Sequence, residues 1–202
     1  MARAGVELVR ALLLVLLYLC VGTGAFSMDA VPIEDMHDDF ADGKIDVLVD
    51  IRTGTEWAQG HVPGAMFIRN LLWKPERLKD LDDLFATCAR PGRRWENKTK
   101  ATLKVAIMCR TSYRCERCDN LFDESGYTKA VRPLDGEGFP TWREKFPDEV
   151  SMDSYPGLQS FSEAFGCGPL QSSVGALVDV AASAQRVDGR TASSGNIMHR
   201  AI

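Results

Sequence analysis

The chain has 202 residues and a formal net charge of -4, with 45% apolar and 26% charged residues. That length suits one domain with additions at its ends, because domains usually contain about 100–150 residues. The mild acidity gives no electrostatic reason to expect binding to nucleic acid, which normally requires a basic face.

The N-terminal segment is typical of a secretory signal peptide. Arg3 and Arg10 precede the uncharged run ALLLVLLYLCVG, and small residues follow it. We expect residues 1–25 to be removed by cleavage after Ala25, which places the protein in the secretory pathway or outside the cell. Two alternatives remain open. An uncleaved segment over 11–28 would anchor the chain in a membrane, its only predicted membrane contact, and a bipartite plastid signal would direct it to a plastid.

Strands and helices alternate from residue 32 onward. The apolar run KIDVLVD predicts a buried strand, TGTEWAQG a short helix and AMFIRN a second strand. PERLKDLDDLFATC spaces its leucines as an amphipathic helix, and LKVAIM predicts a third strand that ends at Cys109. A helix follows over CERCDNLFDESG, then a strand over KAVRPL and a closing helix over FPTWREKF. The alternation predicts an α/β fold, a parallel sheet flanked by helices.

The domain boundaries follow from composition. We expect one domain over 28–147, preceded by the leader 1–25. Ser, Gly and Ala dominate the remainder, so 148–202 is interpreted as a low-complexity tail that is largely disordered. Within it only GALVDVAASA has helical tendency.

Cysteines and one short motif bear on the compartment. Removing the leader would take Cys20 with it and leave five cysteines, an odd number that in an oxidising compartment suggests one thiol kept free. The pairing of the other four cannot be deduced from the sequence. Asn97 begins the motif NKT, an acceptor for N-glycosylation in a secreted eukaryotic protein.

The segment MCRTSYRCERC concentrates cysteine and arginine at a strand end. The loop from Cys109 to Arg114 leads into a helix, so its backbone N–H groups can converge into a cradle for an anion. That cradle, with Arg110 and Arg114 beside it, should lower the pKa of the Cys109 thiol and make it a nucleophile.

These residues resemble the rhodanese (sulfurtransferase) family. CRTSYR is similar to its active loop, VLVDIRTGTEWAQGHVPGAMFI to its first signature and GYTKAVRPLDGEGFPTW to its closing segment, in family order over about residues 33–146. The resemblance implies a single rhodanese-like domain. It also implies transfer of sulfane sulfur through a persulfide on Cys109, from a small anionic donor such as thiosulfate to a thiol or cyanide, without metal or organic cofactor.

The resemblance also assigns site residues. The donor is expected to bind the loop residues that follow Cys109, which are Arg110, Thr111, Ser112, Tyr113 and Arg114. The chain departs from the family pattern at three places. Ser112 replaces the usual loop glycine, Glu137 interrupts the closing glycine pair, and Cys115 stands where serine is common.

Charged residues near the first signature are interpreted as structural. Asp50, Arg52 and Glu56 are expected to form a charge network at a strand end, and His61 to close a turn rather than act as a base.

Alternative functions remain open at the sequence level. Cys115, six residues after Cys109, could act as a resolving thiol in a redox switch, and the domain could serve as a protein-binding module. Related phosphatases and arsenate reductases use a longer Cys-x5-Arg loop, which disfavours those activities here. The pair Cys115 and Cys118 faces the core as small hydrophobes, and no further ligands for a metal lie nearby.

Overall fold

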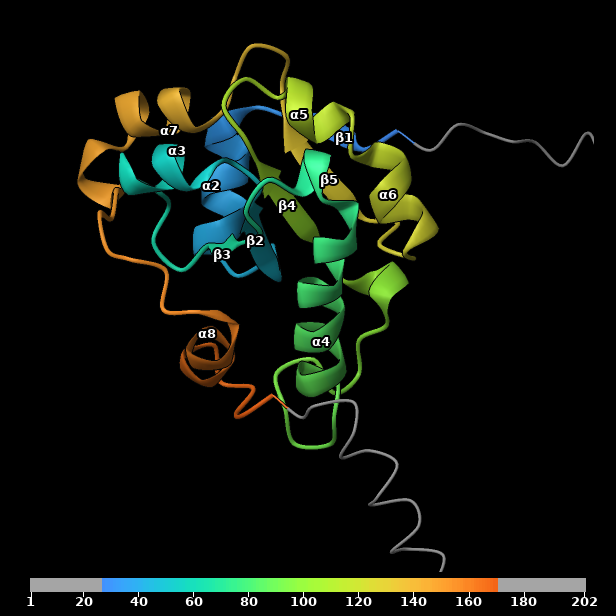
Figure 1. Ribbon diagram of the computed structural model, residues 1–202. Helices are drawn as coiled ribbons and strands as arrows, with labels where there is room; N and C mark the ends of the chain where they lie inside the picture. Colours follow the sequence, from blue (N-terminus) through green and yellow to red (C-terminus); the bar gives the residue numbers. More distant parts are fainter. Residues whose placement is uncertain (1–26, 171–202) are drawn as a thin grey trace, which may run out of the picture. The chain divides into compact units, whose positions relative to one another are not determined.

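The structure is a computed structural model that describes residues 27–170, and it contains a parallel sheet (Figure 1). The sheet has five strands in the order β1-β5-β4-β2-β3, and every paired neighbour is parallel. The strands are β1 (Asp29–Val31), β2 (Val47–Asp50), β3 (Met66–Phe67), β4 (Val105–Met108) and β5 (Ala130–Pro133). The fold is therefore the α/β fold that the sequence predicts.

The central strands are buried along their whole length. Every residue of β2, β4 and β5 is buried, which fits their near-continuous apolar sequences. β4 lies between β2 and β5, with Met108 in register with Asp50. The residue that follows β4 therefore lies at the carboxyl edge of the sheet, next to the end of β2.

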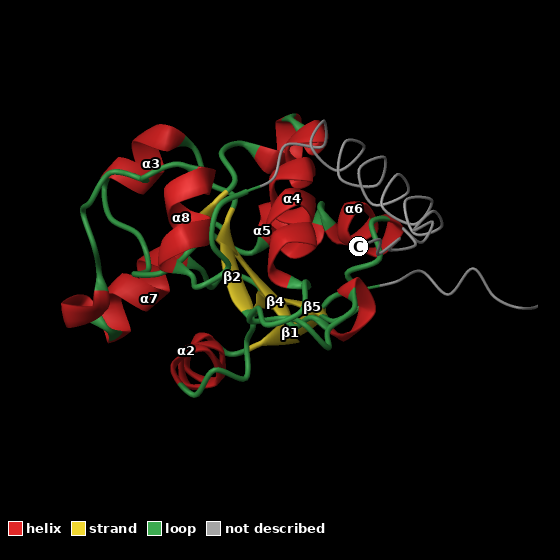
Figure 2. Cartoon of the chain, turned by 90° about the horizontal axis from the view of Figure 1, so that it is seen from below, coloured by secondary structure: helices red, strands yellow, loops and turns green. Residues whose placement is uncertain are grey.

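Helices connect the strands across both faces of the sheet. They are α2 (Ile33–Ala41), α3 (Gly54–Ala58), α5 (Tyr113–Glu116), α6 (Asp119–Glu124) and α7 (Phe139–Lys145), with short 3-10 turns at Leu71–Trp73, Lys100–Thr102 and Pro147–Glu149. The connection from β1 to β2 runs one way along the sheet, and the connection from β4 to β5 runs the other way. Because such crossovers are right-handed, α2 lies on one face and α5 and α6 on the other (Figure 2).

Two elements were not anticipated from the sequence. β1 has only three residues, and α2 has the acid-rich sequence IEDMHDDFA, in which Ile33 and Met36 are the buried positions. A further difference concerns the helix predicted over CERCDNLFDESG. In the structure this segment forms two helices. α5 begins at Tyr113 and ends at Glu116, and α6 begins at Asp119.

The chain divides into two compact units, and the sheet belongs to the first, which has residues 27–75 and 100–152 of the described chain. The second unit has residues 76–99 and 153–170 of the described chain. It contains α4 (Lys79–Cys88), which a 3-10 turn at Pro75–Leu78 precedes, and α8 (Leu158–Ala164).

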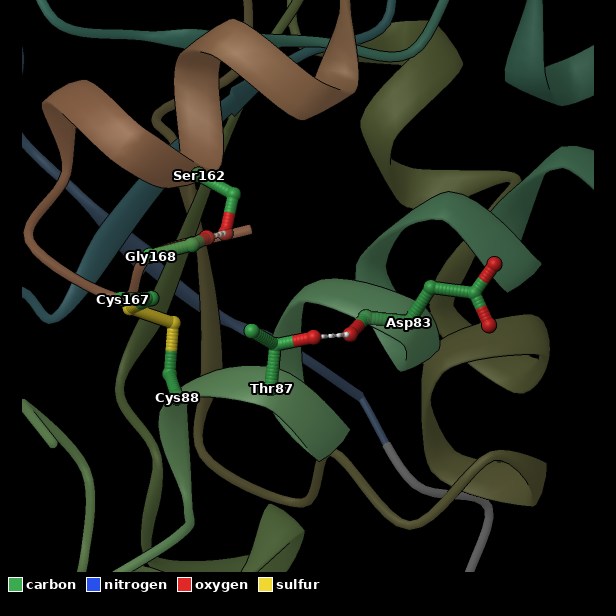
Figure 3. The surroundings of a disulfide bond; sticks show 6 residues. All are labelled: Asp83, Thr87, Cys88, Ser162, Cys167 and Gly168. Carbon is green, nitrogen blue, oxygen red and sulfur yellow. Dashed lines mark hydrogen bonds between the residues drawn. A yellow bond between two sulfur atoms is a disulfide. The ribbon is translucent and has the colours of Figure 1, made fainter. Parts of the chain in front are cut away.

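A disulfide between Cys88 and Cys167 joins the end of α4 to the segment after α8 (Figure 3). Two hydrogen bonds lie beside it. The Thr87 hydroxyl donates to the Asp83 carbonyl at 2.9 Å, and the Ser162 hydroxyl donates to the Gly168 carbonyl at 2.8 Å.

The interpretation of 148–202 as a disordered tail is wrong for its first part. Residues 158–164 form α8, and Phe161 and Cys167 are buried. Polar and small residues hid this element, since α8 reads LQSFSEA and offers a single large aromatic side chain. The leader 1–25 and the segment GALVDVAASA lie outside the described residues. Between residues 27 and 170, no helix is long and apolar enough to cross a membrane.

Candidate active site

Cys109 is the first residue after the central strand β4. Its side chain is buried, with an exposed fraction of 0%. The loop that follows runs over Arg110, Thr111 and Ser112 into α5. This is the strand–loop–helix junction that the sequence indicates, and it places the thiol at the carboxyl edge of the sheet.

Hydrogen-bond donors surround the Cys109 sulfur and favour its charged form. The pKa of Cys109 is lowered to about 6, chiefly by a hydrogen bond from the Cys115 thiol. Burial opposes this shift, and the backbone N–H groups of Cys115, Thr111 and Arg114 add to it. A cysteine whose pKa is about 6 is mostly thiolate at neutral pH, the form that attacks an electrophilic sulfur.

The neighbouring cysteines have the opposite character. Cys115 is buried, its pKa is raised well above the ordinary value by burial, and its sulfur lies 3.4 Å from the Ile107 carbonyl oxygen. The proton of the Cys115 thiol therefore has two acceptors, the Ile107 carbonyl oxygen and the Cys109 sulfur. Ionisation of Cys109 favours donation to the Cys109 sulfur. Burial raises the pKa of Cys118 to about 12. All three are free thiols, and the predicted burial of Cys115 and Cys118 is confirmed.

Arg114, predicted to bind substrate, is engaged in an ion pair. Its Nη2 and Nη1 donate to the two Glu56 carboxylate oxygens at 2.6 and 2.8 Å. Glu56 in turn accepts from the Thr53 backbone N–H at 2.9 Å in a capping box at the start of α3. Pairing with Arg114 lowers the pKa of Glu56 to about 2, so the charges of Arg114 and Glu56 neutralise each other.

Asp50 and Arg52 form a second ion pair, which is buried. The Arg52 Nη2 lies 2.6 Å from Asp50 Oδ2 and also donates to the Gly60 carbonyl at 2.7 Å. Burial raises the pKa of Asp50, and Arg52 opposes that shift. Arg52 Nη1 reaches the Glu56 carbonyl at 3.2 Å, so the structure brings these three predicted network residues together.

His61 makes a different set of contacts. Its backbone pairs with Ser151 through two hydrogen bonds of 2.9 Å, and its ring stacks on Trp57 with the centroids 3.7 Å apart. These contacts tie the turn at His61 to the segment after α7.

Ser112 occupies a backbone conformation that favours glycine, with φ of 63°. Its hydroxyl donates to the Pro133 carbonyl at 2.6 Å and accepts from Arg132 Nη1 at 2.8 Å. These bonds hold the serine where the family has glycine, and they give the hydroxyl protein partners instead of a substrate. Arg132 was not singled out from the sequence, although an arginine inside the otherwise apolar strand AVRP was a usable signal.

The closing segment packs directly on the active loop. A Cβ atom at Gly138 would lie 2.4 Å from the Arg110 carbonyl oxygen and 2.6 Å from that of Cys109, so only glycine fits. The Phe139 N–H donates to the Cys109 carbonyl at 2.9 Å. Glu137, where the chain departs from the family, accepts from the Ile33 N–H at 2.8 Å and holds the start of α2.

A cleft of about 350 Å³ lies beside the loop. Its lining residues are Arg52, Glu56, Gln59, Arg110, Phe139, Pro140 and Arg143. Sequence reasoning anticipated Arg110 here but missed Arg143, which comes from α7 and belongs to no motif. Of the other loop residues, Thr111 is exposed and Tyr113 has an exposed fraction of 57%.

The described residues offer no metal centre. Between residues 27 and 170, no group of three or more His, Cys, Asp and Glu side chains is arranged to hold an ion. The loop and its cleft are built from an anion cradle and cationic side chains, which suit a small anionic ligand.

The model of the rhodanese-like domain family matches residues 33–145, more than half of the chain. The chain therefore belongs to the rhodanese-like domain family. The match covers the sheet from β2 to β5, the active loop and α7.

Solved structures with a similar fold include three of low sequence identity. Reduced CoADR-RHD of Bacillus anthracis is 23% identical with a TM-score of 0.41 over 61% of this chain, which spans only 18% of that protein. The human single-domain sulfurtransferase TSTD1 is 20% identical with a TM-score of 0.38 over 57% of this chain and 96% of that one. Ygr203w of Saccharomyces cerevisiae, described as a homologue of single-domain rhodanese and of the Cdc25 phosphatase catalytic domain, is 18% identical with a TM-score of 0.45 over 63% and 89%.

Proposed function

We propose that the protein is a sulfurtransferase in which Cys109 carries sulfane sulfur as a persulfide. The observation that carries this proposal is the position of Cys109 at the base of the loop, with its pKa lowered to about 6 by donors from Cys115, Thr111 and Arg114. Donors of the loop can also stabilise a persulfide, whose negative charge is on the outer sulfur, about 2 Å beyond the Cys109 sulfur.

The reaction proceeds in two displacements. The Cys109 thiolate attacks the outer sulfur of thiosulfate, the sulfur–sulfur bond of the donor breaks, and its electron pair leaves with sulfite. Cyanide or a thiolate then attacks the outer sulfur of the persulfide. The bond to Cys109 breaks, and the electron pair returns to the Cys109 sulfur as thiolate. No other oxidant or reductant is needed.

Access to the sulfur is part of the proposal. Cys109 has an exposed fraction of 0%, so the side chains above it must move aside before a donor can reach it. The loop is held by the close approach of Gly138 to the backbone of Cys109 and Arg110 and by the hydrogen bond from the Ser112 hydroxyl to the Pro133 carbonyl. Neither contact uses the exposed side chains of Arg110, Thr111 and Tyr113, so these can move without breaking them. We expect donor entry to involve those side chains.

Loop length supports sulfur over phosphate as the ligand. Four residues separate Cys109 from Arg114, and the Cys-x5-Arg loop of related phosphatases is one residue longer. Arg114 is also committed to Glu56, which leaves it less free to wrap a phosphoryl group.

The test is mass spectrometry of the intact protein after incubation with thiosulfate. The expected result is a mass increase of one sulfur atom, located on the peptide that contains Cys109 and lost on addition of cyanide. Hydrolysis of p-nitrophenyl phosphate without any sulfur adduct would overturn the proposal in favour of a phosphatase. A reversible Cys109–Cys115 disulfide without sulfur transfer would favour the thiol switch.

We also propose that the protein enters the secretory pathway. The basic and apolar N-terminus supports this, as does the Cys88–Cys167 disulfide, since disulfides persist in oxidising compartments. Asn97 lies in an exposed turn, where an oligosaccharide could be attached. Expression in a eukaryotic cell should give a protein that begins near Phe26 and loses mass on glycosidase treatment, and Asn97→Gln should abolish that loss. A soluble cytosolic product that begins at Met1 would refute the proposal.

A further inference from the structure

The arginines around the active loop differ in whether a carboxylate neutralises their charge. Arg52 and Arg114 each form an ion pair with a carboxylate, at 2.6 Å in both cases. Arg110 and Arg143 are exposed, and no ion pair engages either one within residues 27–170. Among the arginines that line the cleft, the uncompensated positive charge therefore comes from these two residues.

Both of these arginines line the cleft beside the loop. Arg110 enters it from the loop, and Arg143 enters from the face of α7 that also contributes Phe139 and Pro140. The carboxylate of Glu56 lines the cleft as well, but it is held by Arg114. The cleft thus has an excess of positive charge over an apolar wall.

The cleft is larger than an inorganic donor needs, and the nucleophile does not line it. Its volume of about 350 Å³ is in the range typical of pockets for small organic molecules, roughly 300–1,000 Å³. Cys109 is not among the lining residues. In thiosulfate the charged oxygens are attached to the atom next to the transferred sulfur, so this ion fills little of the cleft when its sulfur is at Cys109. A ligand that fills the cleft and also reaches Cys109 must have a longer, organic body.

We propose that the cleft binds the carboxylates of an organic thiol acceptor, with Arg110 and Arg143 as the charged contacts. The proposal rests on the persulfide chemistry proposed above and names the class of molecule that accepts the sulfur. Arginine suits this role because its planar guanidinium donates two parallel hydrogen bonds to a carboxylate.

The chemical step is the second displacement. The thiolate of the bound acceptor attacks the outer sulfur of the Cys109 persulfide, and a new sulfur–sulfur bond forms on the acceptor. The bond between that sulfur and Cys109 breaks, and its electron pair restores the Cys109 thiolate. Arg110 and Arg143 take no part in bond changes, and they position the acceptor so that its sulfur meets the persulfide.

The kinetic test compares two thiols that differ in charge. Mercaptosuccinate carries two carboxylates, and 2-mercaptoethanol carries none. With Cys109 loaded by thiosulfate, Arg143→Gln should raise the KM for mercaptosuccinate about tenfold and leave its kcat unchanged, because one charge-assisted contact is lost. The KM for 2-mercaptoethanol, which has no carboxylate for Arg143 to bind, should change much less than the KM for mercaptosuccinate.

Lys145→Gln is the matched control. Lys145 also lies on α7, and its substitution also removes one positive charge. Lys145 pairs with Glu34, however, and does not line the cleft. It should behave like the wild type with both thiols. An equal loss in Lys145→Gln, or no change in Arg143→Gln, would overturn the proposal.

Binding measurements test the cleft independently of sulfur transfer. Calorimetry with the Cys109→Ser variant should detect binding of mercaptosuccinate, and adding Arg143→Gln or Arg110→Gln should weaken it about tenfold. If the wild type forms no persulfide but this binding persists, the sulfurtransferase proposal fails and the anion-binding role of the cleft stands. If the persulfide forms but mercaptosuccinate does not bind, the cleft proposal fails alone.

Discussion

Cys109 and Cys88 are both fully buried, yet their sulfurs have different chemistry. Cys88 faces Cys167, whose Cα lies 4.7 Å from its own, and the two form a disulfide in the second unit. Cys109 is surrounded by backbone N–H groups and the Cys115 thiol, and it stays free. Burial therefore does not decide what a cysteine does. The groups that face the sulfur decide it, as donors stabilise a thiolate and a second sulfur at the right distance stabilises a covalent link.

The largest expected effect separates Cys109 from its free neighbours. Cys109→Ser should abolish the sulfur adduct and the thiosulfate:cyanide reaction, because a hydroxyl at this position is not ionised at neutral pH. Cys118→Ala should load sulfur as the wild type does, since burial holds that thiol protonated. Mass spectrometry of both variants provides the measurement. An adduct that survives in Cys109→Ser would assign the nucleophile to another thiol.

Removal of the disulfide should affect stability and not chemistry. The double variant Cys88→Ala/Cys167→Ala should lose about 4.5 kcal/mol of unfolding free energy, the value expected from loop-closure entropy for a link across 79 residues. Urea denaturation monitored by tryptophan fluorescence measures this loss, and dithiothreitol should destabilise only the wild type. Persulfide formation should stay at the wild-type level. A double variant unable to accept sulfur would show that the two cysteine regions depend on each other.

The Glu56–Arg114 pair should contribute stability that depends on pH. The folded pKa of Glu56 is lowered to about 2 from 4.5, so the contribution is complete above pH 4.5 and is lost as the pH falls toward 2. Glu56→Gln keeps the helix-capping geometry and removes the charge, which should cost about 1–2 kcal/mol at pH 6 after allowance for solvent screening.

Urea unfolding at pH 6 and near pH 2 measures the contribution of this pair. The difference between wild type and Glu56→Gln should shrink at the lower pH. Glu124→Gln, which removes an exposed carboxylate from α6, is the control and should show little change at either pH. A Glu56→Gln deficit that is equal at both values would mean that the pair does not stabilise the fold through charge.

The smallest expected effect concerns the support that Cys115 gives to Cys109. In the wild type, the alkylation rate of Cys109 should rise with pH through a midpoint of about 6. Cys115→Ala removes the largest cause of the lowered pKa, so the midpoint should move upward while the rate at pH 9 stays the same. Cys115→Ser retains a donor and should lie closer to the wild type. A midpoint unchanged in Cys115→Ala would assign the lowered pKa to the backbone N–H groups alone.

The sequence predicted the parts of the fold that have a strong periodic signal. β2, β4 and β5 are apolar runs, and α4 carries leucines at helical spacing, so these elements were predicted where the structure has them. β1 and α2 were missed, because three residues and an acid-rich helix give little pattern. α8 was missed for a related reason, since the covalent bond to Cys167 supports an element with few apolar side chains.

At the site, the sequence motifs predicted which residues are present better than they predicted which residues contact one another. The position of Cys109 at the end of β4 followed from the strand pattern. The commitment of Arg114 to Glu56 could not be predicted, because the two lie 58 residues apart and only the packed fold brings them together. Arg143 was missed for the same reason, as it follows the closing motif directly and only the packed fold brings it to the cleft.

The disulfide has a topological consequence for the active loop. Cys88 and Cys167 close a covalent ring of chain, and β4, the Cys109 loop, β5 and α7 all lie on that ring. A protease that cuts once anywhere between residues 88 and 167 therefore opens the ring without releasing a fragment. The nicked protein would migrate as one species until a reductant separates the pieces, so damage to this segment in an oxidising compartment would leave the Cys109 loop tethered to the rest of the chain.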